Sequence, residues 1–174
     1  MVKYISLLFL LTVTSSCNQK KLVTPLKENL SGLINLNGYY FLSKKVNNED
    51  YSTIFFLYKT GVVYNFNSYP TSKKEELEKL LKEDLKVYKE KFNPMYIDWG
   101  IYLIANNNIE YETWYSGSGG KLPVLIKKGK VLNDSTFIFT SIEKQNGKNR
   151  KVIDETYHFR QFSPKPDSTN KFIN

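Results

Sequence analysis

The 174-residue chain has a single cysteine and a single histidine, and these two counts exclude several kinds of site. One cysteine cannot form a disulfide within the chain, and one histidine with one cysteine cannot build a usual zinc site. Arginine is also scarce, since Arg150 and Arg160 are its only two positions among 25 basic residues. Nucleic-acid readers depend on arginine for bidentate contacts, so we expect no nucleic-acid partner. The sequence shows no cofactor or metal motif.

Long apolar runs are scarce too, and the one that stands out lies at the start of the chain. Residues 4–13 are ten mostly apolar positions that follow the basic Lys3. A run of this length is too short to cross a hydrocarbon core of about 30 Å, for which a helix needs roughly 20 residues. Small residues come next, and Cys17 stands directly after Ser16. The pattern predicts a cleaved signal peptide over residues 1–16.

This order of segments resembles the lipobox of bacterial lipoproteins, and Ser16–Cys17–Asn18 is similar to its Bacteroidota variant. The resemblance implies cleavage between Ser16 and Cys17, a diacylglyceryl group on the Cys17 sulfur and an acylated new amino group. It implies a membrane partner through this lipid anchor, on the periplasmic face of the outer membrane. Thr14 departs from the family, in which leucine is usual at that position. The alternative is an ordinary secretory signal with an accidental cysteine.

Beyond a tether over residues 17–35, the hydrophobic period changes to two, which is typical of strands. One amphipathic helix interrupts them at residues 72–92, because Leu77, Leu81 and Leu85 share a face. Ser72 and Glu75 have the spacing of a capping box at its start. Residues 163–174 form a tail. The expected strands are 36–43, 52–58, 62–66, 99–104, 109–115, 136–142 and 156–162, together with 122–127 and 130–132, which flank a bulge or turn at Gly129.

Sequential strands joined by short turns pair as neighbours, and closure of such a meander removes its exposed edges. We therefore predict an all-β fold, an antiparallel up-and-down barrel or half-barrel of about eight strands with one inserted amphipathic helix. Over residues 36–162, the strand order, the paired aromatics and Trp99-Gly100-x-Tyr102 resemble the lipocalin-like domains of Bacteroidota lipoproteins. The lipocalin Gly-x-Trp signature is missing, since Gly38-Tyr39-Tyr40 stands in the first strand.

Aromatic residues make up 15% of the chain, and this is its most unusual feature. An eight-stranded barrel has an interior that either packs solid or holds one small ligand. Six strand aromatics are therefore candidates to line an apolar cavity, and they equally fit a solid core. These are Phe41, Phe56, Tyr64, Tyr102, Tyr111 and Trp114.

Three groups of residues are candidates for a chemical role. His158 lies in a strand, and without a Gly-x-Ser-x-Gly elbow it is read as a structural or rim histidine. Glu110 and Glu112 alternate onto one strand face, either as a glycosidase pair or as outward glutamates beside lysine-bearing strands. The loop around Gly117 lacks the spacing of a phosphate loop. We predict no catalytic residue, and hence that the protein is not an enzyme.

The sequence therefore predicts a lipid-anchored, non-catalytic β-barrel binding module for a small apolar or amphipathic ligand. The alternative is a structural or accessory lipoprotein that docks another envelope protein, and a small hydrolase comes third. A binding module requires an enclosed apolar pocket of roughly 300–1,000 Å³. An accessory protein requires a filled core and an exposed apolar patch, and a hydrolase requires a cleft where His158 or paired carboxylates converge.

Overall fold

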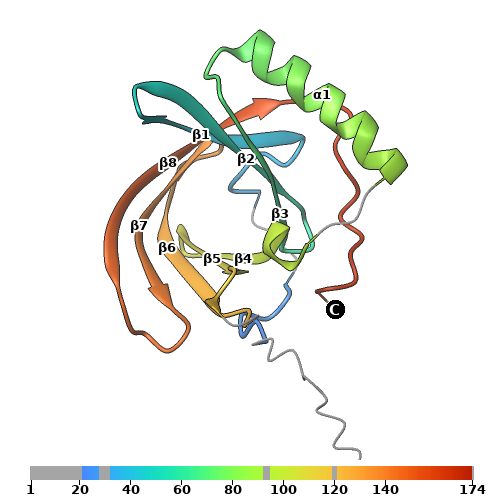
Figure 1. The fold of residues 1–174 in the computed structure, drawn as a ribbon. Helices are drawn as coiled ribbons and strands as arrows, with labels where there is room; N and C mark the ends of the chain where they lie inside the picture. Colours follow the sequence, from blue (N-terminus) through green and yellow to red (C-terminus); the bar gives the residue numbers. More distant parts are fainter. Residues whose placement is uncertain (1–20, 28–31, 92–94, 119–120, 174) are drawn as a thin grey trace, which may run out of the picture.

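The computed structural model describes residues 21–27, 32–91, 95–118 and 121–173, which form a β-barrel with one long helix on its outside (Figure 1). Helix α1 (Lys74–Lys91) and the short 3-10 helix η1 (Tyr96–Asp98) both follow the third strand. The strands are β1 (Gly38–Val46), β2 (Glu49–Leu57), β3 (Val62–Tyr69), β4 (Trp99–Ala105), β5 (Asn108–Trp114), β6 (Val124–Asn133), β7 (Thr136–Lys144) and β8 (Lys151–Gln161).

The barrel is closed. Each strand pairs antiparallel with the next, and β1 pairs with β8 from Gly38 opposite Gln161 to Phe41 opposite His158. Closure leaves no strand edge unpaired along that seam, which is the physical reason such a meander curls up. The structure thus confirms the predicted all-β antiparallel barrel, its up-and-down order and the single helix inserted after the third strand.

Two of the hairpin turns owe their shape to asparagine pairs. Asn47 and Asn48 join β1 to β2 with φ of 52° and 65°, and Asn106 and Asn107 join β4 to β5 with φ of 49° and 62°. Two-residue hairpin turns need positive φ at both central residues, and asparagine tolerates that region better than other residues that carry a side chain. These turns fix the register of their hairpins locally.

The barrel wall separates two apolar clusters. The inner cluster draws side chains from all eight strands, which can meet only inside a closed barrel. The outer cluster combines the outward faces of β1–β6 with α1. The inner cluster contains Ile34, Tyr40, Leu42, Phe55, Leu57, Val63, Tyr102, Ile104, Ile109, Tyr111, Val131, Phe137, Phe139 and Tyr157. The outer cluster contains Tyr39, Ile54, Phe56, Val62, Tyr64, Tyr69, Leu77, Leu81, Leu85, Trp99, Trp114, Val124, Ile126 and Phe162.

Helix α1 packs on the barrel through the predicted leucine stripe, since Leu77 and Leu81 are fully buried in the outer cluster. Its start differs from the predicted capping box. The Ser72 hydroxyl donates to Asp50 (2.7 Å), whereas the Thr71 hydroxyl oxygen accepts from the Lys73 N–H (3.2 Å). Asp50 lies in β2, so the Ser72 hydroxyl is bonded to a neighbouring strand rather than to the first turn of the helix.

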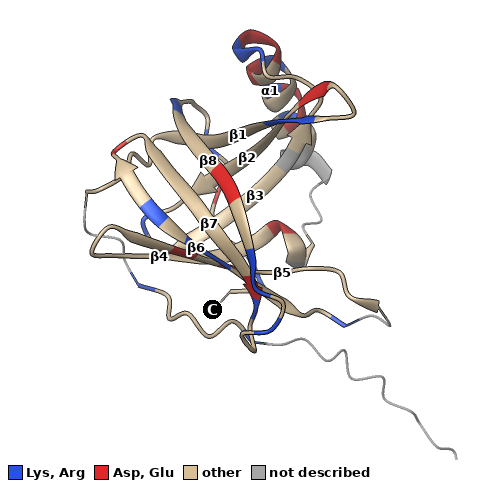
Figure 2. Ribbon diagram, turned by 90° about the vertical axis from the view of Figure 1, so that its left-hand side faces the viewer, with Lys and Arg blue, Asp and Glu red and all other residues tan. Residues whose placement is uncertain are grey.

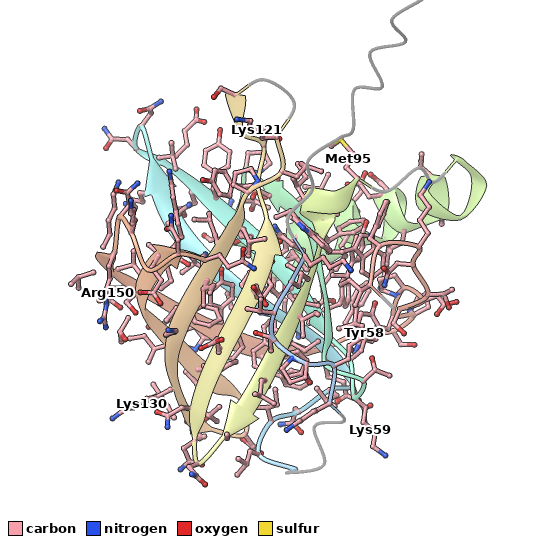
Figure 3. All side chains as sticks on the ribbon, turned by 90° about the horizontal axis from the view of Figure 1, so that it is seen from below. Tyr58, Lys59, Met95, Lys121, Lys130 and Arg150 are labelled. Atoms are coloured by element: carbon pink, nitrogen blue, oxygen red, sulfur yellow. The ribbon has the colours of Figure 1, made fainter. Side chains whose placement is uncertain are left out.

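Residues 21–27 and α1 lie on different sides of the barrel. Helix α1 covers the top of the barrel in Figures 1 and 2, and residues 21–27 lie at the bottom. Figure 3 looks onto that lower side, where residues 21–27 run across the outer face of the sheet. Leu22 from the N-terminal segment and Phe172 and Ile173 from the tail pack against the outer cluster.

Candidate functional site

The six aromatics predicted as cavity candidates do not share one space. Tyr102 and Tyr111 belong to the inner cluster. Phe56, Tyr64 and Trp114 belong to the outer cluster, and Phe41 is partly buried against it. Successive strand residues point to opposite faces of a sheet, so the wall of the barrel divides the set.

Aromatic rings fill the middle of the barrel. The ring of Phe55 on β2 lies 4.7 Å from that of Tyr157 on β8 and 5.0 Å from that of Tyr111 on β5, centroid to centroid. The ring of Phe137 on β7 also stacks on that of Tyr157, at 5.1 Å. Rings from opposite walls thus meet at van der Waals separation, as in a packed core. Burial raises the pKa of Tyr111 and Tyr157.

The inner face also carries one ion pair. Lys127 stands opposite Tyr111 in the ladder, and its Nζ lies 2.6 Å from Glu155 Oε2. The two side chains are 17% and 24% exposed, so water reaches them. A pair in this setting holds its two partners to each other and contributes little net stability.

The residues tested for chemistry do not form a catalytic arrangement. His158 is exposed, and its ring lies 5.9 Å from that of Phe41. Glu110 and Glu112 do share the outer face of β5, as their alternation predicted. Glu110 lies 3.9 Å from Lys128. Over the part of the chain that the structure describes, no group of three or more His, Cys, Asp or Glu residues could hold a metal ion.

Glu112 holds the N-terminal segment against the barrel. Its side chain is 0% exposed, and Oε2 accepts hydrogen bonds from the backbone N–H groups of Val23 (2.9 Å) and Thr24 (2.8 Å). The Thr24 hydroxyl donates to Glu110 Oε1 at 3.3 Å. Buried carboxylates are costly unless they are hydrogen-bonded, and here backbone N–H groups from 88 and 89 residues earlier supply those bonds. We call this arrangement the Glu112 clamp.

Gln145 extends the clamp toward the start of β8. Its Nε2 donates to the Lys21 carbonyl oxygen at 2.7 Å and lies 3.5 Å from Glu112 Oε1. Its own backbone N–H donates to the Val124 carbonyl at 3.1 Å. The hairpin between β7 and β8 and the first described residue of the chain are therefore neighbours.

A groove lies beside the clamp, between the N-terminal segment and the C-terminal tail. Its volume is about 570 Å³. Trp114 and Ile101 line it from the barrel, and Phe172 and Ile173 line it from the tail. Residues 21–26 form the opposite wall. The groove is open on one side, and its lining is about as polar as it is apolar.

Lys165 closes another part of the tail onto the barrel. Its Nζ donates to the carbonyl oxygens of Leu36 (2.8 Å) and Leu57 (2.5 Å) and lies 4.2 Å from the centroid of the Tyr58 ring. Burial lowers the pKa of Lys165 to about 8. The Tyr58 hydroxyl donates to the Pro166 carbonyl at 2.8 Å, which fixes the same stretch of tail.

The sequence alone did not indicate that Glu112 anchors the N-terminal segment or that the ammonium group of Lys165 is half-buried. A signal for Glu112 exists, because the strand alternation puts it on the same face as Trp114, which is a mark of a covered surface. Lys165 offers no comparable signal in the tail. The predicted lipidation and cleavage residues, Cys17 and Ser16, lie outside the described residues.

Comparisons with protein-family models, with curated protein sequences and with solved structures found no match for this chain. Among the helices that the structure describes, none combines the length and the apolar character that a membrane span requires. The functional argument therefore rests on the geometry of the clamp, the groove and the barrel core.

Proposed function

We propose that the protein is a lipid-anchored envelope protein, attached through Cys17 after cleavage behind Ser16, that works by binding rather than catalysis. The Glu112 clamp supports the anchoring half of this proposal. It fixes residues 21–24 on the barrel, and Lys21 is four residues after Cys17. Four extended residues span at most about 14 Å, so a clamped tether keeps the body close to the bilayer.

The groove beside the clamp supports the second part of the proposal, that the protein binds a ligand. Its volume of about 570 Å³ falls in the range of small-molecule sites, and its lining is mixed, with Trp114, Phe172 and Ile173 supplying the apolar part. We propose a single-chain amphipathic lipid as its occupant, because the groove lies beside the chain that leads to the bilayer. The apolar chain would lie along Trp114, with its polar end toward the solvent-exposed Lys21.

This placement differs from a ligand held inside the barrel. The rings of Phe55, Tyr111 and Tyr157 occupy the middle of the interior, which favours a core that packs solid there. The filled core also favours the alternative function, a docking module for another envelope protein. Helix α1 would then be the docking element, since its outward face with Lys79, Glu83 and Val87 lies on the side opposite the tether.

Quenching of tryptophan fluorescence tests the groove. Lysophospholipid brominated on its acyl chain should quench Trp114 when added to the purified protein. The variant Trp114→Phe retains Trp99, which is 0% exposed within the outer cluster, and should lose most of the quenching. Equal quenching in both proteins, or none in either, would reject the groove as the lipid site.

Fatty-acid labelling tests the anchor. Cells that express Cys17→Ser should make a protein that incorporates no labelled fatty acid and keeps its leader. A second variant, Ser15→Ala, preserves the small residues before the cleavage site and should be labelled like the natural chain. Label incorporation into the Cys17→Ser protein would contradict anchoring at this sulfur.

A further inference from the structure

The hairpin between β7 and β8 carries a concentration of positive charge. Lys144, Lys148, Arg150 and Lys151 fall within residues 144–153, a stretch without any acidic residue. Lys148, Arg150 and Lys151 are exposed. We call residues 144–152 the basic hairpin.

The acidic side chain at the base of the hairpin offsets only part of this charge. Glu143, at the base of the hairpin, accepts a hydrogen bond from Lys128 Nζ at 2.7 Å. That bond is the first cause of the lowered pKa of Glu143, and the positive charge of Arg150 lowers the pKa of this carboxyl further. Glu143 is thus shared between Lys128 and Arg150, and within the described part of the chain no such contact engages Lys148 or Lys151. The hairpin also bears an apolar side chain at its edge, since Val152 is 92% exposed beside Lys151. Basic and apolar side chains together are what a lipid-water interface attracts.

The basic hairpin lies next to the tether. Gln145 donates to the Lys21 carbonyl, so the base of the hairpin touches the first described residue after Cys17. In Figures 1 and 2 the hairpin and the N-terminal segment share the lower side of the barrel, opposite α1. Figure 3 shows the Arg150 side chain projecting outward at the margin of this same side.

From this juxtaposition we propose that the basic hairpin binds the anionic phospholipid headgroups of the bilayer that holds the lipid anchor. The inference rests on the proposed anchoring through Cys17. The chain from Cys17 to Lys21 can extend at most about 14 Å. A hairpin bonded to Lys21 is then forced to within a short distance of the surface, where charges are screened over about 8–10 Å. Val23, which is 66% exposed, adds an apolar contact on the same side.

Helix α1 offers the contrast. Its exposed face mixes Lys79 and Lys86 with Glu75, Glu76 and Glu83, and it lies on the far side of the barrel. Binding of the hairpin therefore gives the protein one orientation, in which α1 faces away from the bilayer. Any partner of α1 would approach from the aqueous side.

Lysine footprinting on the lipidated protein tests the proposal. The protein is reconstituted in nanodiscs of phosphatidylcholine alone and of phosphatidylcholine mixed with phosphatidylglycerol, and each lysine's acetylation rate is read by mass spectrometry. Lys144, Lys148 and Lys151 should react roughly fivefold more slowly in the anionic discs. This is the factor expected when each basic side chain is attracted to an anionic surface with the usual strength for one charge. Lys79 and Lys86 are the internal controls and should react equally in both discs.

Two variants with the same change in net charge sharpen the test. Lys148→Glu/Lys151→Glu should abolish the protection of Lys144, whereas Lys79→Glu/Lys86→Glu should leave it unchanged. Molar salt, which shortens the screening length to about 3 Å, should also remove the protection. Equal acetylation of the hairpin in both discs, or protection of α1 instead, would overturn the proposal. Failure of the anchor would be seen separately, as a protein without acyl mass that does not enter the discs.

Discussion

Replacement of Glu112 by glutamine should release the N-terminal segment while the barrel stays folded. The substitution keeps the size of the side chain and leaves one oxygen to accept from Val23 and Thr24, but removes the charge. Hydrogen bonds to charged groups contribute about 1.5–3 kcal/mol and neutral ones about 0.5–1.5 kcal/mol. Two bonds that each weaken by about 1 kcal/mol lower the free energy of clamp opening by about 2 kcal/mol. The open fraction then rises roughly 30-fold.

Trypsin measures this opening directly, because the bond after Lys21 lies inside the clamped segment. When opening is fast compared with cleavage, the cleavage rate tracks the open population. We expect Glu112→Gln to be cut after Lys21 roughly 30 times faster than the natural chain, with the thermal midpoint of the barrel nearly unchanged.

Glu110→Gln is the matched control, because Glu110 lies on the same face of β5 and its contact with the N-terminal segment is a 3.3 Å bond from the Thr24 hydroxyl. That partly exposed contact should change cleavage by less than about twofold. The reasoning is refuted if Glu112→Gln is cleaved no faster than Glu110→Gln. It is also refuted if Glu112→Gln unfolds the whole barrel, because the clamp would then belong to the core.

Three further predictions concern the barrel itself. Burial lowers the pKa of Lys165 from 10.5 to about 8. Between these two pH values the unfolded chain binds more protons than the folded one, so the free energy of unfolding should rise with pH. Urea titrations should show this rise, and Lys165→Met should flatten it; a natural chain with no rise would contradict the burial of the ammonium. Phe55→Ala should lower the free energy of unfolding by about 3–5 kcal/mol, because it removes a ring from the packed interior of the barrel. A decrease under about 1 kcal/mol would mean that the interior around Phe55 is hollow. Gly129→Ala should destabilise by about 1–3 kcal/mol in the same assay, since the new Cβ would collide with the Ile138 carbonyl. Gly147 is the control, because it has a φ of 73° and open space around it, and Gly147→Ala should lower the free energy of unfolding only by the backbone strain of about 1–2 kcal/mol. A Gly129→Ala variant as stable as the natural chain would contradict the close approach of Gly129 to the Ile138 carbonyl.

The fold class could be read from the sequence because its signals are local. Alternating apolar residues such as Val62 and Tyr64 define strand faces, asparagine pairs such as Asn106 and Asn107 define tight turns, and the leucine stripe defines the helix. Short turns between successive strands leave few topologies, and closure follows from the need to pair the edges. The predicted lipid anchor at Cys17 is likewise a local pattern, and it stays a prediction.

The candidate site could not be read in the same way, because it depends on contacts between segments far apart in the chain. Which aromatics face inward depends on the register of every strand, and a register shift of one residue exchanges the two faces. The wall therefore separates Tyr111 from Trp114, although both are aromatic residues of one strand.

The partners of Glu112 and Lys165 were decided only by the tertiary structure. Glu112 reads as a solvated strand glutamate until Val23 and Thr24 lie over it, and Lys165 reads as a solvated tail residue until the carbonyls of the barrel end surround it. A sequence fixes what each side chain can bond, by its charge and its donors. Only the folded chain decides which distant backbone groups come within reach, because that depends on how the two tails close over the barrel.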